Sequence, residues 1–157
     1  LKSVIINLTS LASTKIEEGL IPFGKARIIK QGSDITLISY GIGIKHALQA
    51  IPIAEKEGIS IELIDLRSLR PLDYESVFSS VKKTNRCITI EECFPVCSIG
   101  NHLSASIMEN VFDYLDAPVI KLSGKDVPMP YAKNLEKEAL VTMDEILSTI
   151  KKVTNGK

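Results

Sequence analysis

One apolar stretch of the chain ends in a cluster of charged side chains, which are the first candidates for chemistry. Directly after the apolar run 59–64 come Asp65, Arg67, Arg70 and Asp73. If that run is a parallel strand, these side chains lie at the carboxyl edge of the sheet, where ligands and partner domains of α/β proteins gather. Charges in such a turn more often pair with one another and with water. We therefore predict a structural polar cluster, in which each partly exposed ion pair contributes about 0–1 kcal/mol.

Glycines at two predicted helix starts raise the question of an anion site. Gly41 and Gly43 follow an apolar strand and open a helix, which is the position of a phosphate-binding loop. A dinucleotide fingerprint needs a third glycine where His46 stands, so close packing of strand on helix is the favoured interpretation. Gly100 precedes another helix, where backbone amides attract anions and His102 could assist, but helix capping explains the same residues.

Carboxylates and thiols meet near the end of the predicted strand 87–90. Glu91 and Glu92 are adjacent, so they point to opposite faces and do not form a catalytic pair. A zinc site built on Cys93 and Cys97 would need a second ligand pair, which the sequence does not offer. An odd total of three cysteines favours free thiols in a reducing compartment. We predict no catalytic, cofactor-binding or metal-binding residue.

The composition excludes several classes of partner. The chain has 157 residues, of which 45% are hydrophobic and 24% charged, as in soluble globular domains. Nineteen basic residues balance nineteen acidic ones, which argues against nucleic acid as a partner. No apolar run reaches the roughly 20 residues that span a bilayer, so we expect no membrane segment.

Residue patterns predict an alternation of strands and helices. Apolar runs between turn residues predict strands at 25–30, 34–40, 59–64, 87–90 and 118–122. Helical spacing predicts helices at 44–57, 73–83, 101–114 and 142–153. Gly58 is expected to end the first helix and Asp73 to cap the second. Pro52 predicts a kink in the first helix, or a helix that begins later.

This order predicts an α/β fold, a three-layer αβα sandwich. The turn Gln31-Gly32-Ser33 predicts a hairpin between the first two strands. The five-stranded sheet should therefore be mixed, mostly parallel, with its first strand antiparallel. Residues 21–157 form this domain, and residues 1–20 are interpreted as a linker or the remnant of a preceding domain.

Several blocks of the sequence occur in an order that is typical of one known family. They are Ile21-Pro-Phe-Gly-Lys-Ala26, Ile64-Asp-Leu-Arg-Ser-Leu-Arg-Pro-Leu-Asp73, Ser80-Val-Lys-Lys-Thr84, Glu91-Glu92, Asp113-Tyr-Leu-Asp-Ala-Pro118 and Asp126-Val-Pro-Met-Pro-Tyr-Ala132. Together these blocks resemble the transketolase carboxyl-terminal domain as it occurs in the beta subunit of pyruvate dehydrogenase. The resemblance extends over residues 21–153, nearly the whole chain.

The resemblance implies a function for the whole enzyme and a narrower one for this domain. The full enzyme uses thiamine diphosphate and magnesium to decarboxylate pyruvate and passes the acetyl group to lipoamide. The cofactor-activating glutamate belongs to another domain of the beta subunit, so this fragment is expected to be inactive and to bind no cofactor. Its implied role is assembly with the alpha subunit and a second beta subunit. Compartments that the family implies are the mitochondrial matrix, a plastid or apicoplast stroma, or a bacterial cytoplasm.

The resemblance also implies a docking surface for the subunit-binding domain of the dihydrolipoyl acetyltransferase. Asp116 and the carboxyl end at Lys157 match that surface, and Asp116 is expected to lie near the final helix. Glycine and tryptophan usually follow the paired glutamates in the family, whereas Cys93, Phe94 and Cys97 occur in this stretch here. Two alternatives stay open: a free-standing α/β module that binds a small anion or nucleotide, and the equivalent domain of a related 2-oxo acid or acetoin dehydrogenase.

Overall fold

A computed structural model describes residues 21–154 of the chain; the predicted linker 1–20 lies outside the described residues. The strands are β1 (Arg27–Lys30), β2 (Ile35–Ser39), β3 (Ile61–Asp65), β4 (Cys87–Ile90) and β5 (Ile120–Leu122). The helices are α2 (Ile42–Lys56), α3 (Tyr74–Thr84), α4 (Ile99–Val111), the 3-10 helix η2 (Phe112–Tyr114), α5 (Lys133–Ala139) and α6 (Met143–Thr154).

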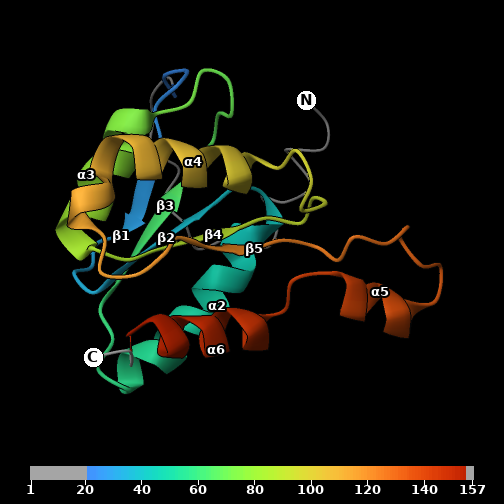
Figure 1. The fold of residues 1–157 in the computed structure, drawn as a ribbon. Helices are drawn as coiled ribbons and strands as arrows, with labels where there is room; N and C mark the ends of the chain where they lie inside the picture. Colours follow the sequence, from blue (N-terminus) through green and yellow to red (C-terminus); the bar gives the residue numbers. More distant parts are fainter. Residues whose placement is uncertain (1–20, 155–157) are drawn as a thin grey trace.

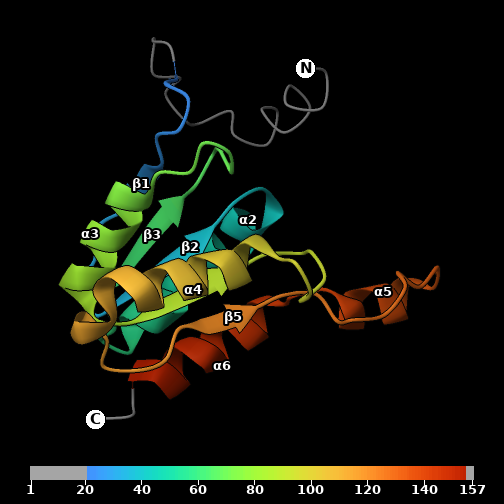
Figure 2. The same ribbon diagram turned by 45° about the horizontal axis from the view of Figure 1, so that its top comes forward.

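The strands form one five-stranded sheet in the order β1-β3-β2-β4-β5. β1 runs antiparallel to β3, and the other neighbouring strands are parallel. Helices α3 and α4 cover one face of the sheet, and α2 and α6 cover the other (Figures 1 and 2). The predicted three-layer αβα sandwich with an antiparallel first strand is confirmed.

The predicted hairpin between the first two strands is wrong, because β1 pairs with β3 rather than with β2. Lys30 at the end of β1 lies opposite Leu63 of β3. The chain then passes the start of β3 at Gly32, where a side chain would overlap the backbone of Ile61. β2 follows on the far side of β3. Its five residues are all buried, so it takes the centre of the sheet, and the more exposed β1 takes the edge.

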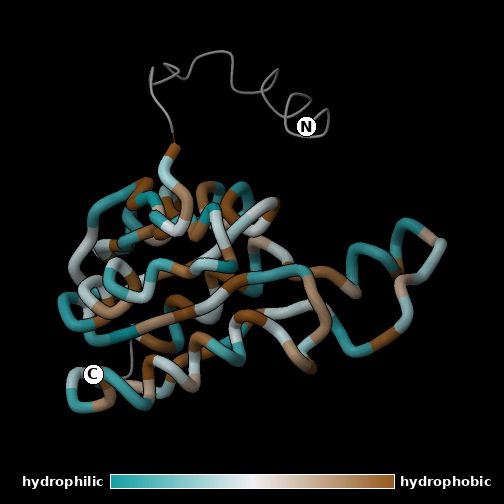
Figure 3. Tube along the Cα trace, turned by 90° about the horizontal axis from the view of Figure 1, so that it is seen from above, coloured by the Kyte–Doolittle hydropathy of each residue, from teal (hydrophilic) through white to brown (hydrophobic). Residues whose placement is uncertain are grey.

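The hydrophobic core has two halves, one on each face of the sheet. Ile35 and Leu37 of β2 belong to the half beneath α2 and α6. Ile38 of the same strand belongs to the half beneath α3 and α4, as the alternation of side chains along a strand requires. Burying a side chain of this size stabilises the fold by about 1.5–3 kcal/mol. In Figure 3 hydrophobic and hydrophilic residues alternate along the trace, as expected where each element has an apolar and a polar side.

Local signals set most helix ends. The Asp73 carboxylate accepts a hydrogen bond from the backbone N–H of Ser76 and caps α3, as predicted. Gly58 follows the end of α2 with a positive φ of 84°, which favours glycine. Pro52 lies inside α2, but the helix already begins at Ile42, so the expectation of a later start is wrong. Pro52 itself is exposed.

Residues 125–139 form a projecting arm that the sequence patterns did not predict. The arm includes the seven-residue helix α5, and Figures 1 and 2 show it extending away from the sandwich. Its two ends meet where the Lys125 N–H donates to the Ala139 carbonyl over 2.8 Å. The sequence patterns predicted no helix between 122 and 142, because a helix this short shows no periodic apolar face.

Candidate functional site

The charged loop after β3 lies at the carboxyl edge of the sheet, as the sequence predicted. Asp65 ends β3 and its Oδ1 accepts a hydrogen bond from the backbone N–H of Arg67 at 3.0 Å. This turn holds Arg67 at a φ of 55°. Arg67 and Arg70 are exposed, and within residues 21–154 neither guanidinium takes part in an ion pair.

Asp73 is the member of the predicted cluster with a defined structural role. It is 5% exposed, and its carboxylate accepts from the N–H of Ala26 at 3.0 Å and from the hydroxyl of Ser76 at 2.8 Å. Burial acts to raise the pKa of Asp73, but these hydrogen bonds and Lys25 outweigh it, so the pKa lies below its ordinary value. Asp73 thus binds the segment before β1 and α3 rather than the two arginines.

Glu91 lies in a buried polar cluster at the end of β4. It is 2% exposed, whereas Glu92 is exposed, so the predicted divergence of the two carboxylates is confirmed. Glu91 Oε1 accepts from the backbone N–H of Gly100 at 2.9 Å, and Oε2 accepts from the Tyr40 hydroxyl at 3.2 Å. The carboxylate therefore joins β2, β4 and the start of α4.

The titratable neighbours of Glu91 are held in their neutral forms. Burial, together with the nearby Glu91 charge, raises the pKa of the Tyr40 phenol. Burial and a hydrogen bond to Glu91 raise the pKa of the Cys93 thiol to about 11. A thiol with that pKa is almost entirely protonated at pH 7 and is a poor nucleophile. The cluster is suited to holding strand and helix together.

The helix start at Gly100 does not fit a phosphate or the diphosphate of a cofactor, and the glycine at position 43 serves close packing. The amide of Gly100 is already taken by Glu91, and the amide of Asn101 by the Ser98 hydroxyl at 3.0 Å. A side chain at Gly43 would lie 3.2 Å from the Ile90 carbonyl oxygen, so this glycine serves close packing of α2 on the sheet. Capping thus accounts for the helix start at Gly100, and close packing accounts for Gly43.

The described part of the chain offers no support for a metal site or for a membrane-spanning helix. Across residues 21–154, no three histidine, cysteine, aspartate or glutamate side chains come together in a way that could hold a metal ion. None of the helices described there has the length and apolar character needed to cross a membrane.

Asp116 lies at the amino edge of the sheet, on a surface shared with the final helix. Its carboxylate pairs with the Arg86 guanidinium at 2.9 Å, and its side chain is 54% exposed. Both residues line a hollow of about 390 Å³, together with Lys152 and Val153 of α6. The expected proximity of Asp116 to the final helix is confirmed. Lys157, the other predicted docking residue, lies outside the described residues.

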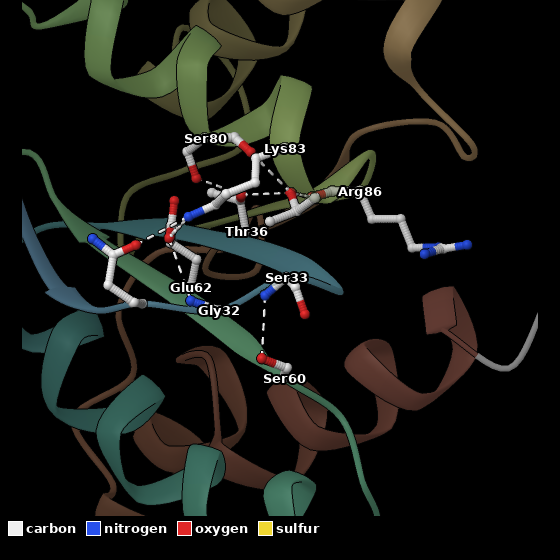
Figure 4. Close-up of polar contacts among 10 residues, drawn as sticks. Gly32, Ser33, Thr36, Ser60, Glu62, Ser80, Lys83 and Arg86 are labelled. Atoms are coloured by element: carbon white, nitrogen blue, oxygen red, sulfur yellow. Dashed lines mark hydrogen bonds and ion pairs between the residues drawn. The ribbon is translucent and has the colours of Figure 1, made fainter.

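A buried polar network between β2, β3 and α3 was not predicted (Figure 4). Glu62 is 1% exposed and pairs with Lys83, and it also accepts from the Gly32 N–H at 3.3 Å. Beside it, the Thr36 hydroxyl lies 2.7 Å from the hydroxyls of both Ser80 and Thr84. The available signal was a lone glutamate inside an apolar strand, which requires a buried partner.

Comparison with known proteins agrees with this architecture. Residues 24–146 match the family model described as "Transketolase, C-terminal domain". The pyruvate dehydrogenase E1 component subunit beta of Rhizobium meliloti is 46% identical over 98% of this chain, and the mitochondrial subunit beta-2 of Oryza sativa is 50% identical over 84%. The chain spans only about a third of these relatives, 33% and 35% of their respective lengths.

Solved structures show the same fold. A protein described as "Split gene transketolase, inactive beta4 tetramer" aligns with a TM-score of 0.76 and 25% identity, covering 90% of this chain and 45% of that one. A 2-oxoglutarate:ferredoxin oxidoreductase from Magnetococcus marinus aligns with a TM-score of 0.53 and 15% identity over 83% of this chain and 19% of that one, which is a likeness of fold alone. By its sequence and its fold, the chain belongs to the transketolase C-terminal domain family.

Proposed function

We propose that this chain is the carboxyl-terminal domain of the beta subunit of a thiamine-dependent pyruvate dehydrogenase. The observation that carries the proposal is 42–50% identity to proteins named as that subunit, over most of the chain. In the full enzyme, thiamine diphosphate and magnesium supply the means to decarboxylate pyruvate. The domain itself is non-catalytic, and its role is to associate subunits and to dock the acetyltransferase core.

The amino edge of the sheet is the proposed docking surface for the subunit-binding domain of the dihydrolipoyl acetyltransferase. Asp116 is more than half exposed there, beside the hollow that α6 lines. Arg86 and Lys152 place two positive charges around this one carboxylate. A basic partner would therefore be attracted weakly, and the attraction would depend on Asp116 and fall with added salt. Lys157 is proposed as a second partner-binding residue.

The loop after β3 is proposed to contact a neighbouring subunit. Arg67 and Arg70 are exposed at the carboxyl edge, the edge that faces partner domains in α/β folds. A guanidinium there can bind a carboxylate of a second chain through two parallel hydrogen bonds. Asp65 accepts from the Arg67 N–H, and Asp73 accepts from Ala26 and Ser76, so both carboxylates bond within this chain and leave the two guanidinium groups for a partner.

The proposal is tested by expressing the complete reading frame that contains this chain together with its alpha subunit. We expect pyruvate-dependent reduction of an artificial electron acceptor only when both chains are present. Arg67→Ala should lower the fraction assembled, as measured by light scattering, and leave turnover per assembled active site unchanged. Lys45→Ala is the matched control, because Lys45 is an exposed residue of α2 far from this loop in the sequence. An assembled Arg67→Ala enzyme that has lost turnover would show the assignment of this loop to be wrong.

Two alternatives are distinguished by the same preparation. A related 2-oxo acid or acetoin dehydrogenase would reduce the acceptor with its own substrate in place of pyruvate. A free-standing anion-binding module would show no dependence on an alpha subunit, and at the Gly100 helix start two of the amides it would use are already bonded within the chain. Some relatives are named as mitochondrial and others come from bacteria, which supports the mitochondrial matrix or a bacterial cytoplasm.

A further inference from the structure

A hollow of about 460 Å³ lies beside the edge strand β1, against helix α3. Strands β1 and β3 contribute Ile28 and Glu62 to its lining, and α3 contributes Glu75, Ser76, Ser79, Ser80 and Lys83. Ligand sites of proteins are hollows of about 300–1,000 Å³ in which a few polar groups converge. This hollow has that size, and charged groups of both signs line it.

The Glu62 carboxylate uses only one of its two oxygens within the described residues. Glu62 is 1% exposed, and its Oε2 accepts from the Gly32 N–H at 3.3 Å and from the Lys83 ammonium (Figure 4). No hydrogen bond from residues 21–154 reaches Oε1. A buried carboxylate oxygen without a hydrogen bond is unfavourable, because it has lost its water and gained no partner. Oε1 is therefore a charged acceptor that a ligand in the hollow can satisfy.

The Lys83 ammonium retains one hydrogen-bond donor beside this acceptor. It donates to the side-chain oxygen of Gln31 over 3.1 Å and to Glu62 Oε2, whereas a lysine ammonium carries three N–H donors. The Lys83 side chain is 43% exposed, so its remaining donor can be reached from solvent. A donor and an acceptor of opposite charge thus lie next to each other in the hollow.

The other groups around the hollow leave this pair as its main charged feature. Glu75 lies at the rim, with its side chain 86% exposed and its carboxylate 3.6 Å from the Lys25 ammonium, so its charge is already balanced. Ser79 is exposed, and its hydroxyl makes no hydrogen bond with another described residue. The hollow therefore offers a ligand one charge of each sign and one hydroxyl.

We propose that this hollow binds a small α-amino acid, with the ligand ammonium on Glu62 Oε1 and the ligand carboxylate on Lys83 Nζ. Because Glu62 and Lys83 contact each other, a ligand that meets both must carry its own two charges close together, as an α-amino acid does on one carbon. A simple anion is repelled by Glu62 and a simple cation by Lys83. The Ser79 hydroxyl and the 40% exposed Ile28 remain for the ligand side chain, which suits a small one such as that of serine.

Titration calorimetry of the 157-residue chain with L-serine tests the proposal. We expect a dissociation constant of about 1 mM, because the charged groups of an open hollow exchange water for the ligand. Ethanolamine is serine without the carboxylate, and 3-hydroxypropionate is serine without the ammonium. Each should bind at least about ten-fold more weakly than serine, since each leaves one of the two charged groups without its partner.

Two substitutions test the site from the side of the protein. Lys83→Met should weaken serine binding by about ten-fold or more, because the ligand carboxylate loses its cation. Lys82→Met is the matched control, since the Lys82 ammonium lies over the Tyr114 ring, 5.2 Å from its centroid, and does not line the hollow. Ser79→Tyr should fill the hollow from an exposed position and abolish binding with the fold intact, as circular dichroism would confirm.

A wild-type chain that gives no binding signal with about 10 mM serine overturns the inference. Equal affinities for serine, ethanolamine and 3-hydroxypropionate also overturn it, as does serine binding that is unchanged in a folded Ser79→Tyr variant. The titration needs no alpha subunit, so its failure leaves the proposed function standing. Conversely, a complete enzyme that fails to oxidise pyruvate would leave the amino acid site standing.

Discussion

Gly100 donates its backbone N–H to the buried Glu91 carboxylate over 2.9 Å, and this contact joins the end of β4 to the first turn of α4. A Cβ at position 100 would lie 2.7 Å from the Thr89 hydroxyl and closer still to Glu91 Oε1. The helix can therefore approach the strand only with glycine here. The charge of Glu91 takes the place that an external anion would occupy at this helix start.

Replacing Gly100 with alanine should therefore destabilise the fold in spite of the higher helix propensity of alanine. Forcing a methyl group into a packed contact costs about 1–3 kcal/mol, whereas the propensity gain is at most about 1 kcal/mol. Urea denaturation measures the free energy of unfolding. Ser104→Ala, in the same helix, is the control and should change it by less than about 0.5 kcal/mol. Equal stability of Gly100→Ala and wild type would show that α4 is free to shift.

Two buried threonines should respond in opposite ways to replacement by valine. Thr89 Oγ1 is buried without a hydrogen-bond partner among the described residues, so Thr89→Val should be neutral or stabilising. Thr36 Oγ1 is bonded to the hydroxyls of Ser80 and Thr84, so Thr36→Val should cost about 1–3 kcal/mol. Paired urea titrations measure both changes. A loss for Thr89→Val as large as that for Thr36→Val would mean that Thr89 has a partner in solution.

The sequence predicted the layers of the fold because the strands and long helices have strong periodic patterns. It failed at β1, where a turn signal predicts that the chain reverses but not which strand it then pairs with. That choice depends on the fully buried β2 taking the centre of the sheet, which is a property of the whole sheet. It also failed at α5, which is too short to show a period and has almost no buried face.

The polar contacts were predicted where they are local and missed where they are not. The cap at Asp73 joins residues three apart, so residue type and spacing were sufficient. Its bond to Ala26, the pair of Arg86 with Asp116, and the pair of Glu62 with Lys83 join distant segments. Such pairs become neighbours only after the sheet order is set.

Because of Asp73, the free energy of unfolding should depend on pH in the acid range. The pKa of Asp73 is lower in the folded chain than the ordinary value of 3.8. Its contribution to the free energy of unfolding is therefore complete above that value. It is lost as the pH falls from there through the pKa of the folded state. Asp73→Ala should cost about 0.5–2 kcal/mol at pH 7, and the difference from wild type should shrink below pH 3.8.

Urea titrations of Asp73→Ala between neutral pH and the acid limit of folding measure this dependence. Asp113→Ala is the control, because Asp113 is exposed and accepts no hydrogen bond from another described residue. A constant stability difference between wild type and Asp73→Ala at all pH values would assign the loss to packing and not to the carboxylate charge.

Lys83 should stabilise the fold mainly because its charge neutralises the buried Glu62 carboxylate. The carboxylate is 1% exposed, while the lysine side chain is 43% exposed, so removing the lysine leaves a buried charge with only the Gly32 amide. Lys83→Met should cost about 1–3 kcal/mol. The double variant Glu62→Gln/Lys83→Met should recover part of this loss, since no buried charge remains. Additive losses in the double-mutant cycle would refute the coupling.

Asp116 should set the salt dependence of the proposed docking to the subunit-binding domain of the acetyltransferase. Its carboxylate is exposed and bonded to Arg86, so Asp116→Asn removes one negative charge and leaves Arg86 facing the partner uncompensated. An exposed pair is worth about 0.2–1 kcal/mol, so affinity should fall by up to about five-fold, with a weaker dependence on salt. Lys152→Gln, in the same hollow, should have the opposite effect and tighten binding. Titration calorimetry of the full-length beta subunit at two salt concentrations measures both variants, and an affinity and salt dependence unchanged in Asp116→Asn would exclude Asp116 from the interface.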